Sequence, residues 1–215
     1  MKVLFLFTYG TSIKNWADSG YLSRELNFFK SMNQKYDVDF IFLTYGDESD
    51  EQYVKELSFV SVVPVYKYLT TKRNKIHNAI NLIINLRSLL KKLNIKYDLI
   101  KTNQLFGAWI AIVLKGFSKK PLIIRTGYDL FLFSLKDKKN FFKIFVYYLL
   151  TFLCLNISNL YTVTSQSDFS FIKKTYIFKK NKLKVRRNWV DGLKFKNIKQ
   201  IEFLDKIKIL SVGRL

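Results

Sequence analysis

The chain has 215 residues with a single cysteine, a single histidine and a formal net charge of +21, and 49% of its residues are hydrophobic. This composition is too apolar for a disordered chain, and the length allows a sizeable core. One cysteine excludes an intrachain disulfide framework, and one histidine excludes a catalytic zinc site built from several histidines.

The positive charge is concentrated in the later part of the chain. Residues 1–66 hold 6 basic and 9 acidic residues, whereas residues 67–215 hold 31 basic and 7 acidic residues. Lysines outnumber arginines by 30 to 7, although surfaces specific for phosphate or nucleic acid favour arginine, whose planar guanidinium binds phosphate through two hydrogen bonds. The excess of lysine therefore favours attraction to an anionic membrane over specific recognition of nucleic acid.

Short apolar runs alternate with helical patterns along the chain. Taken in order, the runs predict strands at 3–7, 38–44, 60–65, 98–102, 121–125, 160–164, 182–186 and 206–212. Apolar residues at helical spacing predict helices at 21–32, 75–93, 106–116, 138–157 and 167–175. The expected buried face of helix 75–93 carries Ile76, Ile80, Ile83 or Ile84, Leu86 and Leu90. Strands separated by such helices predict an α/β fold with a Rossmann-like, doubly wound parallel sheet.

A long loop after the first strand carries the first candidate binding residues. The sequence contains neither G-x-G-x-x-G nor G-x-x-x-x-G-K-[ST], so a dinucleotide-binding fingerprint and a P-loop are both excluded. Ser19 and Gly20 stand just before helix 21–32, and the N-terminus of a helix favours an anion. The alternative is ordinary capping of this helix by Asp18 or Ser19.

The second candidate site follows the fifth strand, where Arg125, Thr126, Gly127, Tyr128 and Asp129 are consecutive. In a doubly wound sheet, ligands bind at the carboxyl ends of the strands. An arginine, a glycine and a carboxylate at this point are therefore placed for a binding or catalytic site. The alternative is a salt bridge between Arg125 and Asp129 beside a turn glycine.

The helix 138–157 is rich in aromatic residues and begins among lysines. The aromatic residues are Phe141, Phe142, Phe145, Tyr147, Tyr148 and Phe152, and the lysines are Lys136, Lys138, Lys139 and Lys143. Rings beside cations are typical of a segment that lies in the membrane interface, and the uncharged stretch is too short to span a bilayer. The alternative is a helix that faces the core. We expect Cys154 to be an inert core thiol and His77 to be solvated.

Several passages, in this order, resemble the N-terminal half of family 4 glycosyltransferases, which have the GT-B fold of two Rossmann-like domains. They are the opening strand 2–8 with the helix that carries Arg24-Glu25-Leu26, the strand and loop 121–129, the strand 160–165 that ends in serine, and the stretch 188–191 with Phe195. Residues 207–215 then look like the opening strand of a second domain. From the residues alone, this last strand either joins the preceding sheet or opens a missing domain.

The resemblance implies three segments. These are a Rossmann-like acceptor-side domain at 1–187, an interdomain connector at 188–205, and the first strand of a missing donor-binding domain at 206–215. It implies an enzyme that moves a sugar from a nucleotide-sugar to a glycan or lipid-linked acceptor in cell-surface polysaccharide synthesis. The configuration would be retained, and no metal ion or other cofactor would be needed. Residues 1–215 by themselves would be inactive.

The resemblance also implies roles for particular residues. Asp129 is the implied catalytic residue, with Tyr128 where many members have histidine, and a tyrosine is a poor base at neutral pH. The implied acceptor-binding residues are Ser19, Gly20, Asn103, Arg125, Thr126 and Gly127, and the implied donor-diphosphate residues are Gly213 and Arg214.

The implied location is cytoplasmic, with peripheral attachment to the anionic inner face of the cell membrane. The alternative from another functional class is a non-enzymatic basic module that binds an anionic membrane or nucleic acid. The charge of residues 67–215 motivates that alternative.

Overall fold

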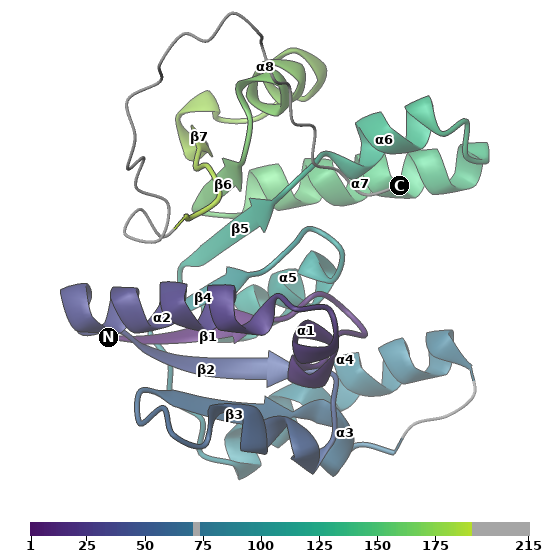
Figure 1. The fold of residues 1–215 in the computed structure, drawn as a ribbon. Helices are drawn as coiled ribbons and strands as arrows, with labels where there is room; N and C mark the ends of the chain where they lie inside the picture. Colours follow the sequence, from purple (N-terminus) through teal and green to yellow (C-terminus); the bar gives the residue numbers. More distant parts are fainter. Residues whose placement is uncertain (71–73, 191–215) are drawn as a thin grey trace, which may run out of the picture.

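The computed structural model describes residues 1–70 and 74–190, and these contain a seven-stranded sheet in which all neighbouring strands are parallel. The strands are β1 (Lys2–Leu6), β2 (Asp39–Thr44), β3 (Val60–Pro64), β4 (Leu99–Thr102), β5 (Leu122–Thr126), β6 (Leu160–Val163) and β7 (Leu183–Val185). Their order is β3-β2-β1-β4-β5-β6-β7 (Figure 1). The direction of winding reverses between β1 and β4, and ligands of such sheets bind beside that reversal.

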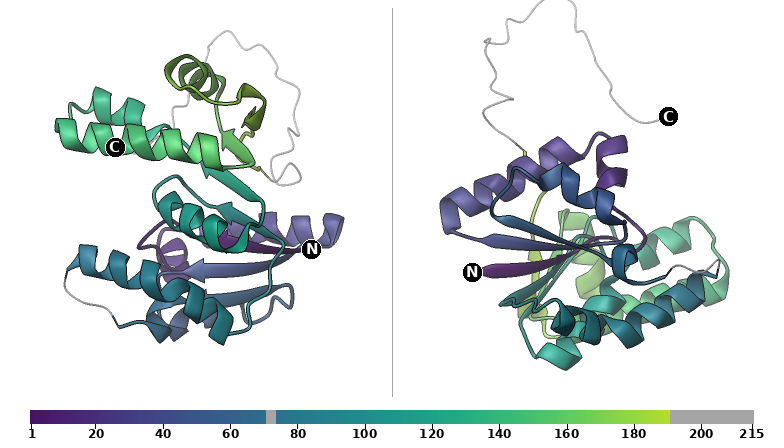
Figure 2. Two further views of the ribbon diagram at one scale, coloured as in Figure 1. Left: turned by 180° about the vertical axis from the view of Figure 1, so that it is seen from behind. Right: turned by 90° about the horizontal axis from the view of Figure 1, so that it is seen from below.

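Helices cover both faces of the sheet. The helices α1 (Ile13–Asp18) and α2 (Leu22–Tyr36) lie on one face, and α4 (Lys75–Lys92), α5 (Ala108–Ser118) and α7 (Phe141–Ile157) lie on the other (Figure 2). The remaining short elements are η1 (Glu48–Val54), α3 (Val65–Tyr68), α6 (Leu130–Lys136), α8 (Gln166–Thr175) and η2 (Lys180–Lys182). Among the described helices, none combines the length and apolarity that crossing a membrane requires.

The predicted α/β, Rossmann-like, doubly wound parallel sheet is confirmed. The first seven predicted strands match the observed ones to within one residue at each end, and the eighth, at 206–212, lies outside the described residues. Aromatic packing holds the sheet to α2, because the ring of Phe29 lies 4.9 Å from that of Phe5 and 4.8 Å from that of Phe42. These contacts fix the strands β1 and β2, from which two loops of the candidate site emerge.

Two short helices, α1 and α6, occur where the sequence pattern predicts loops. Ser12 caps α1, since its Oγ accepts a hydrogen bond from the backbone N–H of Asn15 at 3.1 Å and its own N–H donates to the Asn15 side chain at 2.8 Å. Ile13 and Trp16 of α1 are buried. The two helices have 6 and 7 residues, and so few residues cannot display a helical period clearly.

The buried face predicted for helix 75–93 is correct only for the C-terminal half of the helix. The buried side chains of α4 are Leu82, Leu86, Leu89 and Leu90. The exposed side chains are Ile76, Ile80, Ile83 and Ile84. The N-terminal half of α4 extends past the ends of the strands (Figure 1), so the isoleucines have no sheet beneath them. The expectations for two other residues are confirmed, because Cys154 is buried and His77 is exposed.

Candidate functional site

The candidate site is the edge of the sheet at which the parallel strands end. Hydrogen bonds tie three loops together along this edge. The backbone N–H of Asn103, after β4, donates to Leu6 O at the end of β1 (2.8 Å), and its Nδ2 lies 3.4 Å from Thr8 Oγ1. The backbone N–H of Gly127, after β5, donates to Gln104 Oε1 at 2.8 Å. The loops after β1, β4 and β5 therefore form one connected surface at the point where the winding reverses.

Arg125 connects this surface to the segment that follows β7. Its guanidinium donates to Asn103 O at 3.0 Å and to Asn188 Oδ1 at 2.6 Å. Burial lowers the pKa of Arg125. The salt bridge between Arg125 and Asp129 considered as an alternative does not form, because the Asp129 carboxylate caps a helix. Arg125 thus holds two chain segments together.

A second cation lies on the same face of the sheet as Arg125. Lys101 of β4 places its Nζ 4.8 Å above the ring of Phe5. Burial, and then the charge of Arg125, lower the pKa of Lys101 to about 7, while Glu25 opposes this shift. An anion that bound near Lys101 would favour the charged form of its ammonium group and oppose this lowering of its pKa.

Thr126 and Gly127 shape the loop after β5 through internal hydrogen bonds. Thr126 is buried, and its hydroxyl donates to the carbonyl oxygen of Tyr128. The hydroxyl of Thr164, after β6, donates to Gly127 O at 2.8 Å. Both predicted acceptor-binding residues lie at the candidate edge. The side chain of Thr126, however, is engaged within the loop.

Asp129 is fully buried and acts as the N-cap of α6. Its Oδ1 accepts a hydrogen bond from the backbone N–H of Leu132 at 2.7 Å. The other carboxylate oxygen has no hydrogen-bond partner among the described residues. Burial is the main cause that raises the pKa of Asp129 from 3.8 to about 6, although the bond from Leu132 lowers it. The predicted catalytic carboxylate therefore faces the interior.

Tyr128 differs from its neighbour because it faces outward. Its side chain is 49% exposed. Its ring meets that of Phe133 in an edge-on contact, with centroids 5.1 Å apart. Of the two predicted catalytic residues, Tyr128 is thus the one whose side chain a ligand at this edge can reach.

Ser19 and Gly20 lie between α1 and α2 and end the first of these helices. The backbone N–H of Ser19 donates to Asn15 O, and that of Gly20 donates to Ala17 O, at 3.1 and 3.0 Å. The N-cap of α2 is Tyr21, which makes no side-chain capping bond. The expected capping of α2 by Asp18 or Ser19 is therefore wrong, since Ser19 closes the preceding turn instead.

A cluster of aromatic side chains that the sequence pattern did not predict lies at the same edge. The Tyr9 ring lies 5.0 Å from that of Tyr45 and 5.1 Å from that of Trp109, and the Tyr45 ring lies 6.4 Å from that of Tyr66. Tyr45 is buried, whereas Tyr9, Tyr66 and Trp109 are half-buried. Burial raises the pKa of both Tyr9 and Tyr45. Each of these residues lies within a few residues of a strand's carboxyl end or in the helix that follows the strand. This position in the sequence is the signal that could have identified the cluster.

Gly107 allows the loops after β1 and β4 to approach each other. It has a φ of +109°, and a Cβ at this position would lie 2.8 Å from the backbone nitrogen of Tyr9. Gly107→Ala is therefore expected to destabilise the chain by about 2 kcal/mol, because the new side chain meets backbone and the φ is strained. Urea unfolding measures this loss. Gly116→Ala is the control, since nothing lies within 4 Å of a Cβ there, and an equal loss in both variants would contradict the prediction.

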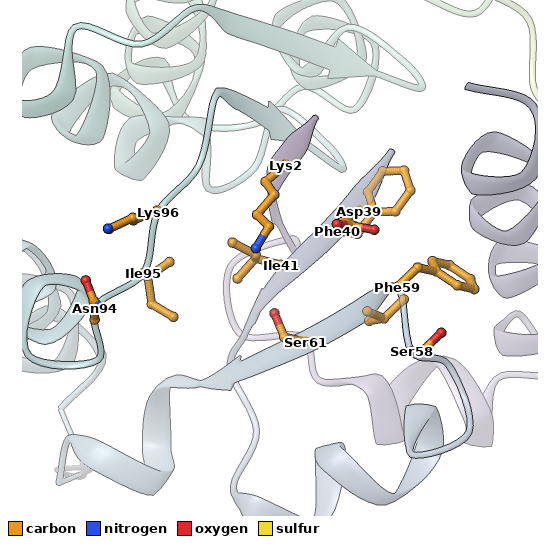
Figure 3. Close-up of a pocket in the computed structure, with 11 residues that line it drawn as sticks. Lys2, Asp39, Phe40, Ile41, Ser58, Phe59, Ser61, Asn94, Ile95 and Lys96 are labelled. Carbon is orange, nitrogen blue, oxygen red and sulfur yellow. The ribbon is translucent and has the colours of Figure 1, made fainter. Parts of the chain in front are cut away.

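The cavity drawn in Figure 3 lies at the opposite edge of the sheet. It has a volume of about 420 Å³, and its lining includes Lys2 and Asp39 at the amino ends of β1 and β2, with Lys96 ahead of β4. Ligands of doubly wound sheets bind at the carboxyl ends, so this cavity forms no part of the candidate site. The predicted donor-diphosphate residues Gly213 and Arg214 lie outside the described residues.

A family model and several solved structures match this chain. The family model of Glycosyltransferase Family 4 matches residues 26–192. No curated protein matches the chain. Among solved structures, Anabaena Alr3699/HepE in complex with UDP has a TM-score of 0.55 and 16% identity, covering 89% of this chain and 45% of that chain.

Two other solved structures are similar. The lipopolysaccharide outer core galactosyltransferase WaaB in its apo form has a TM-score of 0.52 and 15% identity, covering 88% of this chain and 46% of that chain. A sucrose-phosphate synthase (tll1590) structure from Thermosynechococcus elongatus has a TM-score of 0.56 and 12% identity, with 89% and 91% covered. This chain thus spans less than half of the length of HepE and WaaB, and identities this low establish a shared fold.

The family match extends from α2 past β7 and so includes the predicted and observed site segments after β4, β5 and β6. It agrees with the resemblance carried by the ordered sequence passages and with the observed parallel sheet. On these grounds the chain belongs to Glycosyltransferase Family 4.

Proposed function

We propose that this chain forms the acceptor-side domain of a glycosyltransferase. The enzyme would move a sugar from a nucleotide-sugar to a glycan or lipid-linked acceptor in cell-surface polysaccharide synthesis, on the cytoplasmic side of the membrane. The observation that carries the proposal is the connected edge after β1, β4 and β5, which gathers aromatic rings and the exposed Tyr128 at the reversal of the sheet. Aromatic surfaces with a few polar groups are typical of small-molecule sites.

The similar solved structures support a nucleotide-sugar as the donor. HepE has been solved with UDP and with UDP-glucose, and WaaB is a galactosyltransferase of the lipopolysaccharide outer core. We propose the same class of donor here. Retention of configuration and independence of metal ions are further parts of the proposal, which rest on the family resemblance. Gly213 and Arg214 are the residues proposed for the donor diphosphate.

In this proposal, Tyr128 and Asp129 have different tasks. The Tyr128 hydroxyl would hydrogen-bond to the acceptor or to the departing group, because its side chain is exposed at the edge. Asp129 would position Tyr128 by fixing the first turn of α6, since its carboxylate accepts the Leu132 N–H. Arg125 and Asn103 would hold the neighbouring loops in place through their hydrogen bond.

The test is a transfer assay on the protein purified as its gene encodes it. It would be incubated with a panel of UDP- and GDP-sugars, with and without lipid-linked acceptors extracted from membranes. We expect release of nucleoside diphosphate that depends on both one donor and one acceptor. If the protein neither bound nor hydrolysed any of the nucleotide-sugars, this result would contradict the proposal. Heat-denatured protein serves as the control for spontaneous hydrolysis.

A further inference from the structure

Two helices on one face of the sheet extend well past the ends of the strands. The N-terminal half of α4 and the turn between α6 and α7 project on the side toward which β2 points, and the view from behind agrees (Figures 1 and 2). The helices that form these projections expose large apolar side chains along their length. On α6 and α7 these are Phe133, Leu135, Phe141, Phe142, Phe145, Val146, Leu149 and Leu153, and on α4 they are Ile76, Ile80, Ile83 and Ile84.

The helix α7 is apolar on all sides, yet one side of it remains exposed. Thr151, Cys154 and Leu155 face the core, whereas Phe141 and Phe142 are 82% and 72% exposed. A helix that is hydrophobic all round is normally buried, and a contiguous exposed apolar surface marks an interaction site. The exposed side of α7 is therefore a candidate interaction surface.

Four lysines surround the tip of this projection. Lys136, Lys138, Lys139 and Lys143 are all exposed, and α7 itself contains no acidic residue. Asp137 is the acid among them, and it pairs with Lys139 at 3.3 Å. The tip thus combines apolar rings with excess positive charge. A second copy of this chain would bring like charges together, whereas an anionic bilayer supplies the opposite charge.

We propose that the exposed apolar residues and lysines of α6 and α7 bind the headgroup region of an anionic phospholipid bilayer. The phenylalanine rings would enter the boundary between headgroups and acyl chains, and the lysine ammonium groups would remain at the phosphate level. The isoleucines of α4, which project on the same side, would form a second apolar contact. This surface is distinct from the cavity at the amino ends of the strands.

The position of this surface bears on the proposed function. Tyr128 of the candidate site contacts Phe133 of α6, so the site and the bilayer-binding surface are continuous. In combination with the proposed function, on which this step rests, the acceptor would be lipid-linked and would reach Tyr128 from the bilayer. Binding to the bilayer itself does not require that function.

The experiment is vesicle flotation with the 215-residue chain. The probes are vesicles of phosphatidylcholine and vesicles of phosphatidylcholine mixed with phosphatidylglycerol. We expect binding to the mixed vesicles that weakens as salt is raised. Two variants should each reduce the binding constant at least about tenfold. One is Phe141→Ser/Phe142→Ser, and the other has Lys136, Lys138, Lys139 and Lys143 changed to Gln.

Matched controls use exposed residues elsewhere. Ile177→Ser removes an exposed apolar side chain from another segment, and Lys14, Lys30, Lys35 and Lys55 changed to Gln remove the same charge from other parts of the surface. Both controls should bind nearly as the unchanged chain does. Three outcomes would each overturn the proposal. The control and test variants could lose binding equally, or the chain could bind neither vesicle. The chain could also form a dimer in solution that the Phe141→Ser/Phe142→Ser variant abolishes. Vesicle binding without any sugar transfer would support this surface and count against the proposed function alone.

Discussion

Replacing Asp129 with asparagine is expected to stabilise the chain at neutral pH by at most about 3 kcal/mol, reduced by the cost of burying the new amide N–H groups. The reason is the position of the carboxylate, which is fully buried and has one oxygen without a described hydrogen-bond partner. Burial raises its pKa from 3.8 to about 6. Asparagine is as good an N-cap as aspartate, so the hydrogen bond from Leu132 can be kept while the cost of a buried charge is removed.

The sign of the pH dependence follows from the direction of this shift. Below pH 3.8 the carboxyl group is protonated in the folded and the unfolded chain, and its titration costs nothing. Between pH 3.8 and about 6 the unfolded chain ionises first, so the contribution of Asp129 to stability falls as the pH rises. Above about pH 6 the carboxyl group is ionised in both states, and the full free-energy cost of the buried charge remains. The benefit of Asp129→Asn should therefore be small in acid and should grow to its full size near neutrality.

Thermal unfolding across this pH range measures the effect. At neutral pH the melting temperature of Asp129→Asn should exceed that of the unchanged chain by at most about 5–10 °C. Asp18→Asn is the matched control, because it makes the same chemical change at an exposed residue. Parallel pH curves for the unchanged chain and for Asp129→Asn would contradict the prediction.

The same variant separates the two possible roles of Asp129 in transfer. If Asp129 positions Tyr128, the variant should keep nearly all of its transfer rate, since the cap is preserved. If Asp129 exchanges a proton with the reacting groups, the rate should fall by about a hundredfold or more, while stability still rises. We expect the first result, because the carboxylate faces the interior.

The sheet could be predicted from the sequence because its strands are buried on both faces. Such strands are continuous apolar runs, and β1 and β2 are read directly from Val3–Phe7 and from the residues after Val38. The site after β5 was also predictable, since the carboxyl end of a parallel strand fixes its place. What could not be predicted is which way Tyr128 and Asp129 face. That depends on α6, a helix of 7 residues that leaves no clear period.

The aromatic cluster and the exposure of the α4 isoleucines could not be predicted from the sequence either, for a different reason. Tyr9, Tyr45, Tyr66 and Trp109 come from four separate segments, and only the order of the strands brings them together. The stripe of isoleucines has the spacing of a buried face. Its exposure depends on how far α4 extends past the sheet, which no local pattern records.

Replacing Trp109 with alanine is expected to raise the KM for the acceptor by about 30-fold in the transfer assay. Trp109 lies in the first turn of α5, with its ring 5.1 Å from that of Tyr9 at the candidate edge. Large aromatic side chains supply much of the binding free energy at such sites, and a loss of about 2 kcal/mol corresponds to this factor. The KM for the nucleotide-sugar should change little, because the proposed diphosphate-binding residues belong to another segment.

Steady-state kinetics with each substrate varied in turn would measure the two KM values. Phe117→Ala is the control, since it removes an aromatic side chain from the opposite end of α5, beside the amino ends of the strands. Trp109→Phe should recover most of the acceptor affinity, because a flat ring is restored against Tyr9. If Trp109→Ala lowered kcat while the KM for the acceptor stayed unchanged, or if Phe117→Ala raised that KM equally, the acceptor would have to bind away from the aromatic cluster. A selective rise in the acceptor KM would instead place the acceptor on the edge after β1 and β4, within reach of Tyr128.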